Sequence, residues 1–367
     1  MLSAQSGAVH RPDRGFFISR GYNAGQNCDR IAVENIPYSA AFRAADEERK
    51  CKAMKIIERE EILRRLTPAW CIGLMRDCLS QLEEGRAVQY LRTVTPLPSG
   101  DIMGYMPAAV SGAFGAKVIT VFHHNSEKGL PSHQGSVLLF DGETGTLQAM
   151  LDGGAITEIR TGAASAVATD LLARPDAEVL ALIGSGAQAR SHLLAIREIR
   201  KLREVRVWSP SLESDTRFAR EMGELTGLSV RICASAKEAA DGADILCTLT
   251  PSKTPVLERE WLKPGAHVNA VGACSADARE LTGELVRDSV FYCDSVESVM
   301  AESGDFLIPL REGLFGEEHL RGTLGELLLG RKPGRTSPEE ITVYESLGLA
   351  VEDIACAEAL CRPAAKL

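Results

Sequence analysis

The sequence predicts an α/β protein of two domains, one with a Rossmann-type, doubly wound parallel sheet and a second one of α+β type. Three observations support this fold class. Strand and helix patterns alternate from residue 178 to about residue 295, and an apolar run at 179–183 leads directly into a glycine turn. Short strand patterns separated by turns fill residues 87–150. Alternation is typical of parallel sheets, whereas strands joined by tight turns are typical of antiparallel ones.

The composition is that of an ordinary globular protein. The chain has 367 residues, of which 45% are hydrophobic and 25% are charged. Its net charge of −9 argues against a nucleic acid or an anionic membrane surface as a partner, although local basic residues could serve a small anionic substrate. No apolar run approaches the roughly 20 residues that span a bilayer. We therefore expect a cytoplasmic protein without a membrane partner.

Ten cysteines are scattered along the chain. They form no Cys-x-x-Cys pair and no Cys/His group with the spacing of a zinc site. Buried thiols in a reducing compartment are the simplest interpretation. The sequence thus predicts neither a disulfide nor a bound metal.

The chain divides into an N-terminal extension and two domains. Residues 1–53 show neither helical nor strand periodicity and lack the apolar core of a secretory signal, so we expect a disordered extension there. A helical pattern begins at Met54 and continues to Leu66. The predicted α+β domain comprises residues 54–172 and 341–367, and the predicted Rossmann domain comprises residues 173–340.

The elements of the α+β domain follow from local patterns. Thr67 and Pro68 form a typical helix start, and Asp141-Gly142 and Thr144-Gly145 predict tight turns before the last strand. The expected strands are 90–94, 102–107, 115–123, 136–140 and 147–150, and the expected helices are 68–84, 161–172 and 346–361.

The elements of the Rossmann domain follow from the alternation. The predicted strands are 179–183, 204–208, 229–232, 244–249, 267–271 and 289–293. The predicted helices are 191–202, with a start near Ala187, then 213–226, 236–241, 295–303 and 317–330.

The glycine turn that follows the apolar run at 179–183 is typical of a dinucleotide-binding βαβ unit. Gly184 allows the tight turn, Gly186 lets the backbone approach a pyrophosphate, and Ala189 takes the place of a third small residue between helix and strand. The N-terminus of the helix that begins near Ala187 would favour the phosphates, because its free N–H groups and its dipole attract negative charge. An ordinary strand-to-helix turn remains the alternative.

The end of the second Rossmann strand bears on the choice between NAD(H) and NADP(H). An acidic residue there would bind the ribose 2′-hydroxyl and repel a 2′-phosphate, but residues 207–211 contain no carboxylate. Ser209 and Ser211 could hold a phosphate, with Arg190 or Arg217 as counter-charge. Alternatively, the serines only cap the helix at 213–226. The sequence favours NADP(H), with NAD(H) possible.

Several strings resemble the ornithine cyclodeaminase/mu-crystallin family, in order along residues 54–361. The resemblance implies a homodimer whose α+β domain binds the substrate and dimerises, while the middle segment is the NAD(P)-binding domain. The strings are Tyr-Leu-Arg-Thr at 90–93, Met-Pro-Ala at 106–108, Ala-Lys-Val at 116–118, Pro-Ser-His-Gln at 131–134, Glu-Ile-Arg-Thr-Gly-Ala-Ala-Ser at 158–165, Gly-Ser-Gly-Ala-Gln-Ala at 184–189, Pro-Gly-Ala-His-Val-Asn-Ala-Val-Gly at 264–272 and Thr-Val-Tyr-Glu-Ser-Leu-Gly-Leu-Ala-Val-Glu-Asp at 342–353.

The same resemblance implies the site residues. Arg92, Lys117 and Arg160 match the family positions that hold a substrate carboxylate, with Lys117 and Arg160 as the catalytic candidates and Leu347 near the substrate. From the residues alone, surface side chains or internal ion pairs would be the simpler interpretation. The implied cofactor contacts, in addition to Gly184, Gly186 and Ser211, are Ser136, Thr161, Ala187, Gln188, Ser209, Thr250, Val271, Gly272 and Ser346.

Two departures from the family pattern favour imine reduction over ornithine cyclodeamination. The cyclodeaminases carry an aspartate where this chain has Cys274 and a glutamate where it has Gly104, so both carboxylates for a second ammonium group are missing. Asp277 and His133 are weaker candidates, more simply explained as a surface carboxylate and a structural histidine. We expect NAD(P)H-dependent reduction of a small, cyclic α-imino acid such as Δ1-pyrroline-2-carboxylate or Δ1-piperideine-2-carboxylate. The alternatives are ornithine cyclodeamination, an alanine-type dehydrogenase and a ligand-binding protein.

Overall fold

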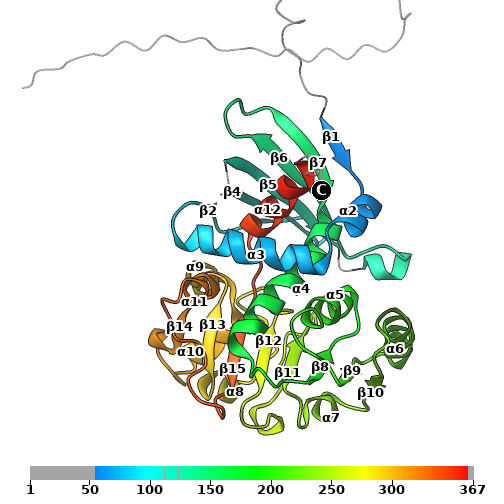
Figure 1. The fold of residues 1–367 in the computed structure, drawn as a ribbon, viewed down its shortest axis with the longest axis vertical. Helices are drawn as coiled ribbons and strands as arrows, with labels where there is room; N and C mark the ends of the chain where they lie inside the picture. The colour runs from blue at the N-terminus through cyan, green and yellow to red at the C-terminus, as the bar shows by residue number, and fades with distance from the viewer. Residues whose placement is uncertain (1–53, 111, 123, 363–367) are drawn as a thin grey trace, which may run out of the picture. The chain divides into compact units, whose positions relative to one another are not determined.

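The computed structural model describes residues 54–110, 112–122 and 124–362. The extension expected at 1–53 and the chain end at 363–367 lie outside the described residues. The described residues belong to one compact unit, Lys52–Leu367, which contains two β-sheets (Figure 1). None of the helices in this described part is long and apolar enough to cross a membrane.

The first sheet has seven strands and is formed by the strand-rich region of the sequence. Its order is β1-β7-β6-β5-β4-β2, and β3 also pairs with β4. Neighbouring strands are antiparallel except β1 and β7, which are parallel. The strands are β1 (Lys55–Ile57), β2 (Val88–Gln89), β3 (Thr93–Pro96), β4 (Ile102–Val110), β5 (Ala113–Val121), β6 (His133–Asp141) and β7 (Leu147–Asp152).

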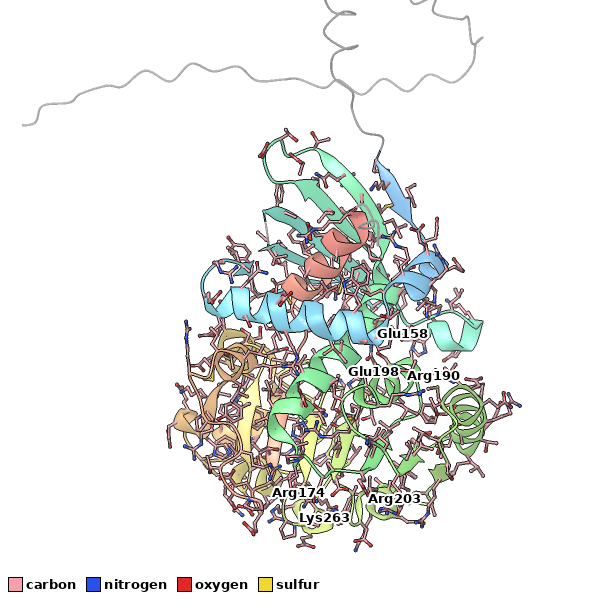
Figure 2. The ribbon with its side chains drawn as sticks, viewed as in Figure 1. Glu158, Arg174, Arg190, Glu198, Arg203 and Lys263 are labelled. Carbon is pink, nitrogen blue, oxygen red and sulfur yellow. The ribbon has the colours of Figure 1, made fainter. Side chains whose placement is uncertain are left out.

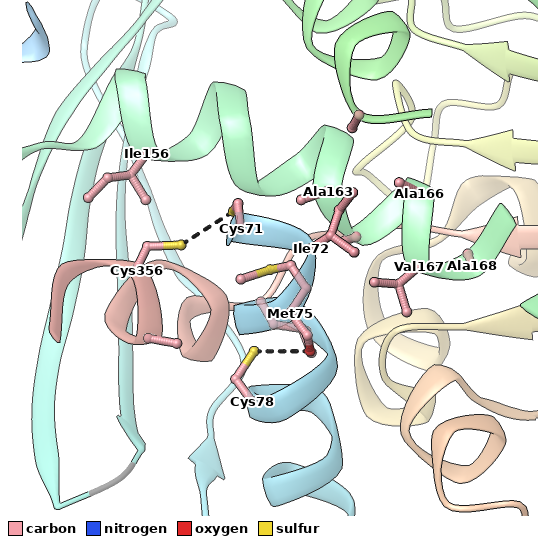
Figure 3. Close-up of a cluster of buried hydrophobic side chains, with 14 of the residues drawn as sticks. Cys71, Ile72, Met75, Cys78, Ile156, Ala163, Ala166, Val167, Ala168 and Cys356 are labelled. Atoms are coloured by element: carbon pink, nitrogen blue, oxygen red, sulfur yellow. Dashed lines mark hydrogen bonds between the residues drawn. The ribbon is translucent and has the colours of Figure 1, made fainter. Parts of the chain in front are cut away.

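Helices pack on this sheet and form a shared core (Figure 3). Cys71 and Met75 of one helix are buried among Ile156 and Cys356 of two others, and the Sγ atoms of Cys71 and Cys356 lie 3.7 Å apart. The cysteines among the described residues are free thiols. The helices are α2 (Arg59–Arg65), α3 (Pro68–Glu83), α4 (Gly153–Leu172) and α12 (Ala350–Cys361), with a 3-10 turn, η1 (Asn125–Lys128).

The single helix predicted from Met54 is wrong. Lys55–Ile57 forms a strand in which Ile56 lies opposite Met150 of β7, and α2 begins only at Arg59. Isoleucine is β-branched and favours strands, and a run of a few apolar residues does not distinguish a strand from a helix.

Helix α4 begins at Gly153, earlier than the predicted start at Thr161. The side chain of Asp152 caps it by accepting a hydrogen bond from the backbone N–H of Ala155 at 2.6 Å. Gly153 and Gly154 have low helix propensity, which hides this start in the sequence. The early turns matter because they carry Thr157 and Arg160.

The second sheet has eight parallel strands in the order β10-β9-β8-β11-β12-β15-β13-β14. Strands β9 and β10 lie on one side of β8 and the others on the opposite side, which confirms the predicted doubly wound fold. All residues of β8 are buried, which explains its continuous apolar run. The strands are β8 (Val179–Ile183), β9 (Glu204–Trp208), β10 (Val230–Ile232), β11 (Ile245–Thr248), β12 (His267–Ala270), β13 (Val290–Cys293), β14 (Leu320–Thr323) and β15 (Thr342–Glu345).

Helices flank this parallel sheet. Arg174 and Lys263 lie at the amino end of β11, where both pair with Asp244, at 2.8 and 2.6 Å (Figure 2). That end lies opposite the carboxyl edge where dinucleotides bind. The elements are α5 (Ala187–Ile196), α6 (Leu212–Thr226), α7 (Ala236–Ala240), α8 (Gly283–Arg287), α9 (Val296–Glu302), α10 (Gly304–Arg311) and α11 (Leu324–Leu328), with 3-10 turns η2 (Arg259–Trp261) and η3 (Glu317–His319).

Two C-terminal segments differ from the prediction. Residues 317–330 form η3, β14 and α11 rather than one helix. Strand β15 pairs with β12 and β13 in the parallel sheet, although we placed residues 341–367 in the α+β domain. A short apolar run does not reveal which sheet it joins. The segment therefore connects both sheets, with β15 in one and α12 against the other.

Candidate active site

The glycine turn has the backbone geometry that the sequence predicts. Gly184 follows β8 with φ +118°, and a Cβ there would lie 2.7 Å from the carbonyl oxygen of Leu249. Gly186 is the N-cap of α5, has no side-chain cap, and a Cβ there would meet open space. The first N–H groups of this ten-residue helix, which begins at Ala187, thus have no side-chain cap, and open space adjoins Gly186. This arrangement fits a pyrophosphate.

The serine turn after β9 contains a carboxylate that the sequence analysis missed. Asp215, in the first turn of α6, is buried and accepts hydrogen bonds from the N–H and Oγ of Ser209, at 2.9 and 2.5 Å. Ser211 caps α6 by accepting from the N–H of Ser214. Acidic residues are common in first helical turns, but nothing in the sequence says that this one turns toward Ser209.

The two arginines considered as counter-charges at this turn differ. Arg190, on α5 (Figure 2), pairs with Glu221 at 2.6 Å and lies over the ring of Phe218. Arg217 is exposed and makes one long contact with Ser214. Arg217 is therefore the arginine of the two without a carboxylate partner in the described structure.

Three of the predicted cofactor contacts lie at the carboxyl edge of the parallel sheet. Thr250 follows β11, and Val271 and Gly272 follow the adjacent β12. Buried Glu280 joins them: it accepts from the N–H and Oγ1 of Thr250 and from the N–H of Gly272, all at 2.7 Å. Glu280 is not predicted from the sequence, since a glutamate in a loop is normally a surface residue.

The remaining candidate cofactor contacts come from several different elements. Ser346 follows β15 at the same sheet edge, and its buried Oγ has no hydrogen-bond partner among the described residues. Gln188 Oε1, on α5, is likewise buried and unpartnered within the described part of the chain. Thr161 lies on α4 and donates to the Thr157 carbonyl. Ser136 pairs with Val118 in the first sheet, so its side chain points to the opposite face from the neighbouring Lys117.

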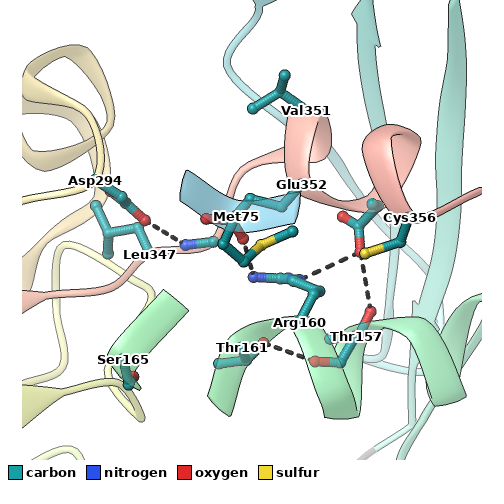
Figure 4. Close-up of polar contacts among 12 residues, drawn as sticks. Met75, Thr157, Arg160, Thr161, Ser165, Asp294, Leu347, Val351, Glu352 and Cys356 are labelled. Atoms are coloured by element: carbon teal, nitrogen blue, oxygen red, sulfur yellow. Dashed lines mark hydrogen bonds and ion pairs between the residues drawn. The ribbon is translucent and has the colours of Figure 1, made fainter. Parts of the chain in front are cut away.

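The three predicted substrate cations each have a carboxylate partner. Lys117, on β5, lies 2.8 Å from Asp353. Arg160, on α4, lies 2.7 Å from Glu352 (Figure 4) and 3.2 Å from Asp353. Arg92, between β2 and β3, pairs with Glu302 at 2.9 Å. Internal ion pairing, the alternative considered from the residues, is thus present, and α12 supplies two of the three partners.

The turn formed by Leu347 and Gly348 adjoins two of these cations, Arg92 and Arg160. Arg92 donates to the carbonyl oxygen of Leu347 at 2.5 Å. Gly348 has φ +80°, and a Cβ there would lie 2.7 Å from a guanidinium nitrogen of Arg160. The N–H of Gly348 donates to Asp294 at 2.7 Å. Because Ser346 precedes this turn, the cations adjoin the carboxyl edge of the parallel sheet.

A model of the ornithine cyclodeaminase/mu-crystallin family matches residues 52–364. The chain belongs to this family. It is 43% identical over 278 residues to the ketimine reductase mu-crystallin of Mus musculus, covering 75% of this chain and 85% of that one. The family predicted from the sequence is therefore confirmed.

Solved structures of family members support the same fold. The Δ1-pyrroline-2-carboxylate reductase of Thermococcus litoralis, in complex with NADH and L-proline, superposes with a TM-score of 0.82 at 38% identity, covering 84% of this chain and 96% of that one. An archaeal alanine dehydrogenase dimer with bound NAD gives a TM-score of 0.80 at 30% identity, covering 84% and 95%.

Cys274 and Gly104, which replace the two cyclodeaminase carboxylates, and the weaker candidates Asp277 and His133 can each be located in the structure. Cys274 is exposed, with its Sγ 4.0 Å from the carbonyl oxygen of Leu347. A Cβ at Gly104 would lie 2.9 Å from Cγ1 of Ile119, so a glutamate there would require that side chain to shift. The Asp277 side chain is 74% exposed, as expected for a surface carboxylate. His133, at the start of β6, is exposed beside Ser132.

Burial moves the pKa values of three groups at this site toward neutrality. Burial lowers the pKa of Lys117 to about 8, although Asp353 acts in the opposite direction. Burial raises the pKa of Glu352 to about 7, against the effect of Arg160, and that of Asp294 to about 6, against its backbone hydrogen bonds. No group of three or more His, Cys, Asp or Glu among the described residues could hold a metal ion.

Proposed function

We propose that this protein reduces a small cyclic α-imino acid, such as Δ1-pyrroline-2-carboxylate or Δ1-piperideine-2-carboxylate, to the amino acid with NAD(P)H. The observation that carries the proposal is the convergence of Arg92 and Arg160 on the turn of Leu347 and Gly348, next to the dinucleotide edge of the sheet. Two relatives support the reaction type: the mouse protein is named a ketimine reductase, and the Thermococcus enzyme was solved with NADH and L-proline.

The chain's own residues fit a nicotinamide dinucleotide. The open position at Gly186 and the uncapped N-terminus of α5 suit the phosphates, and the unpartnered oxygens of Gln188 and Ser346 suit polar groups of the ligand. Thr250 and Gly272, held by Glu280, would line the same edge, together with Val271 and Thr161. When bound, the nicotinamide supplies the hydride that reduces the imine carbon.

The proposal includes a preference for NADP(H) over NAD(H). Both oxygens of Asp215 accept hydrogen bonds from Ser209, and the N–H of Ser211 donates to Ser209 Oγ, so the carboxylate is occupied and the Ser211 hydroxyl is the serine donor left for a ligand in the described structure. The exposed Arg217 adds a positive charge on the adjoining helix. These groups suit a 2′-phosphate better than the carboxylate typical of NAD sites.

In the proposed mechanism the cations bind and orient the substrate carboxylate. Nη2 of Arg160 and one N–H of Lys117 have no hydrogen-bond partner among the described residues, and Arg92 borders the same turn. Charge-assisted hydrogen bonds from these groups fix the imino acid in place, and positioning supplies most of the rate enhancement. Lys117, with its pKa of about 8, is suited to donate a proton to the imine nitrogen near neutral pH.

We further propose a homodimer that uses the outer face of the first sheet. Met103 and Tyr105 on β4 and Phe114 on β5 are large apolar side chains that remain 39–48% exposed. Such a patch on a sheet face is typical of a protein–protein interface. The alanine dehydrogenase neighbour is described as a dimer. Light scattering on the purified protein tests this, and a monomer would contradict it.

The proposed location is the cytoplasm. The Sγ atoms of Cys71 and Cys356 lie 3.7 Å apart and form no disulfide bond. The other described cysteines are also free thiols, which suits a reducing compartment. Fluorescence microscopy of the tagged full chain tests the location, and export from the cell would contradict it.

The reaction is tested by following NADPH and NADH oxidation with cyclic and linear imino acids, beside an assay for ammonia release from L-ornithine. We expect oxidation with a cyclic imino acid and no ammonia from ornithine. Ammonia release without oxidation of NAD(P)H by any imino acid would favour cyclodeamination instead.

A further inference from the structure

Two of the proposed substrate-binding cations are already paired with carboxylates of the protein. Lys117 and Arg160 pair with Asp353 and Glu352, and the four side chains are only 3, 5, 0 and 0% exposed. Both carboxylates lie in the first turn of α12, which favours their negative charge. If all four groups are ionised, this buried set carries no net positive charge for an anionic substrate.

Among the described residues, Arg160 is the cation that hydrogen-bonds Glu352. Asp294, after β13, adds a further carboxylate, and its Oδ1 has no hydrogen-bond partner among the described residues. Cys71 and Cys78 face Glu352 from α3, and Tyr344 faces it from β15; burial raises the pKa of Cys78 and Tyr344, and the Cys356 contact together with burial raises that of Cys71. These three groups therefore stay neutral near pH 7.

One oxygen of Glu352 is suited to hold a proton. Its Oε2 accepts the hydrogen bond of Arg160, whereas its Oε1 is buried and has no partner within the described residues. An ionised carboxylate oxygen left without a donor in the interior is unfavourable. A proton on Oε1 removes that cost and leaves the bond from Arg160 to Oε2 intact.

We propose that Glu352 takes up a proton on Oε1 when a monoanionic carboxylate substrate binds at Arg160 and Lys117, and thereby limits the negative charge of the buried site. The inference rests on the proposed function, since it takes these cations as the carboxylate site. It assigns Glu352 a positioning role: it acts through Arg160 and sets how substrate affinity varies with pH.

The pKa of Glu352 determines whether substrate affinity rises or falls with pH. Its pKa of about 7, raised by burial, means that it is largely protonated at low pH and ionised above neutrality. Below this value the substrate binds a protein that already holds the proton. Above it, each bound carboxylate must draw a proton from solvent, so affinity falls about tenfold per pH unit.

The test measures protons taken up on ligand binding. The probe is cyclopent-1-ene-1-carboxylate, a carbon analogue of the cyclic imine with no titrating nitrogen, added by calorimetric titration to protein saturated with NADP⁺ at about pH 8 in buffers of different ionisation enthalpy. We expect uptake of at least one proton per ligand for the native chain, since Lys117, with its pKa of about 8, adds a fraction of a proton to that of Glu352. Glu352→Gln keeps an acceptor for Arg160 but cannot titrate, so uptake falls by about one proton to the fraction that Lys117 takes up, and affinity at this pH rises about tenfold.

Two matched variants locate the effect. Glu158→Gln removes a carboxylate of α4 (Figure 2) that pairs with the partly exposed Arg59, and we expect native proton uptake from it. Asp294→Asn is expected to retain uptake as well. Loss of uptake in Asp294→Asn but not in Glu352→Gln would overturn the assignment to Glu352.

Other outcomes also decide the proposal. Binding by the native chain without proton uptake, or with the same affinity from about pH 6 to about pH 8.5, would overturn it even if Glu352→Gln failed to fold. A failure of the carboxylate to bind at any pH would overturn the proposed function, and this inference with it.

Discussion

The nucleotide side and the substrate side of the site recognise charge with different groups. On the nucleotide side, Gly184 and Gly186 leave space, and the N–H groups of α5 face a phosphate position. On the substrate side, Arg92, Lys117 and Arg160 are side chains from three separate elements, each balanced by a carboxylate. One side uses backbone that cannot titrate. The other uses buried ionisable groups, and burial lowers the pKa of Lys117 to about 8 and raises that of Glu352 to about 7.

This difference explains why the two halves should respond to different perturbations. Backbone N–H groups keep their charge distribution at every pH, so nucleotide binding depends on shape and on small residues. Buried ion pairs depend on the protonation of each partner, and removing one partner leaves the other uncompensated. Substitutions on the two sides should therefore have separable effects.

Arg160→Gln should damage the substrate side alone. It removes a guanidinium that pairs with Glu352 and Asp353, so kcat/KM for the imino acid should fall roughly a hundredfold to a thousandfold. NADPH affinity, measured by fluorescence titration, should stay unchanged. Arg59→Gln, at an exposed pair with Glu158, is the control and should retain activity. A comparable loss of NADPH affinity in Arg160→Gln would show that the two sides are not separate.

A pair of glycine variants should damage the nucleotide side. Gly184→Ala puts a Cβ 2.7 Å from a carbonyl oxygen at φ +118°, so it should cost about 1–3 kcal/mol of unfolding free energy as well as NADPH affinity. Gly186→Ala adds a Cβ in open space at φ −81°, so it should weaken NADPH binding while stability stays nearly native. Denaturant melts and nucleotide titrations check both. Unchanged NADPH affinity in Gly186→Ala would place the phosphates elsewhere.

The pH dependence should also differ between the two sides. Lys117 must be protonated to donate, and its pKa is lowered to about 8, so kcat should be constant below this value and fall about tenfold per unit above it. NADPH affinity should stay flat over the same range. Initial rates at saturating substrate test this. A kcat that stays constant to about pH 9.5 would remove Lys117 as the proton donor.

The smallest expected effect concerns cofactor choice. Arg217→Ala removes one exposed charge beside the serine turn, so KM for NADPH should rise about two- to fivefold and KM for NADH should not change. Arg220→Ala, on the same helix and also exposed, is the matched control. Equal changes for both nucleotides would contradict a 2′-phosphate at this turn.

The nucleotide side could be predicted from the sequence because its parts are contiguous. Strand β8, the glycine turn and the start of α5 occupy one short segment, and small residues at fixed spacing leave few alternative geometries. The predicted start near Ala187 agrees with the structure. Glu280 could not be predicted, because its contacts with Thr250 and Gly272 depend on how a distant loop folds back.

The substrate side could be predicted only in part. The resemblance to the family picked out Arg92, Lys117 and Arg160, but their partners Glu302, Asp353 and Glu352 lie far away in the sequence. No local pattern says that the first turn of α12 meets β5 and α4, because that contact depends on tertiary packing. The same limit applies to β15, whose apolar residues suit either sheet.

The most direct test of the proposed function is NADPH oxidation by the purified protein with Δ1-pyrroline-2-carboxylate and Δ1-piperideine-2-carboxylate, compared with ammonia release from L-ornithine. We predict oxidation of NADPH with at least one cyclic imino acid, formation of the matching amino acid, and no ammonia from ornithine. Ammonia release from ornithine, with no NADPH or NADH oxidation by any imino acid, would contradict the account.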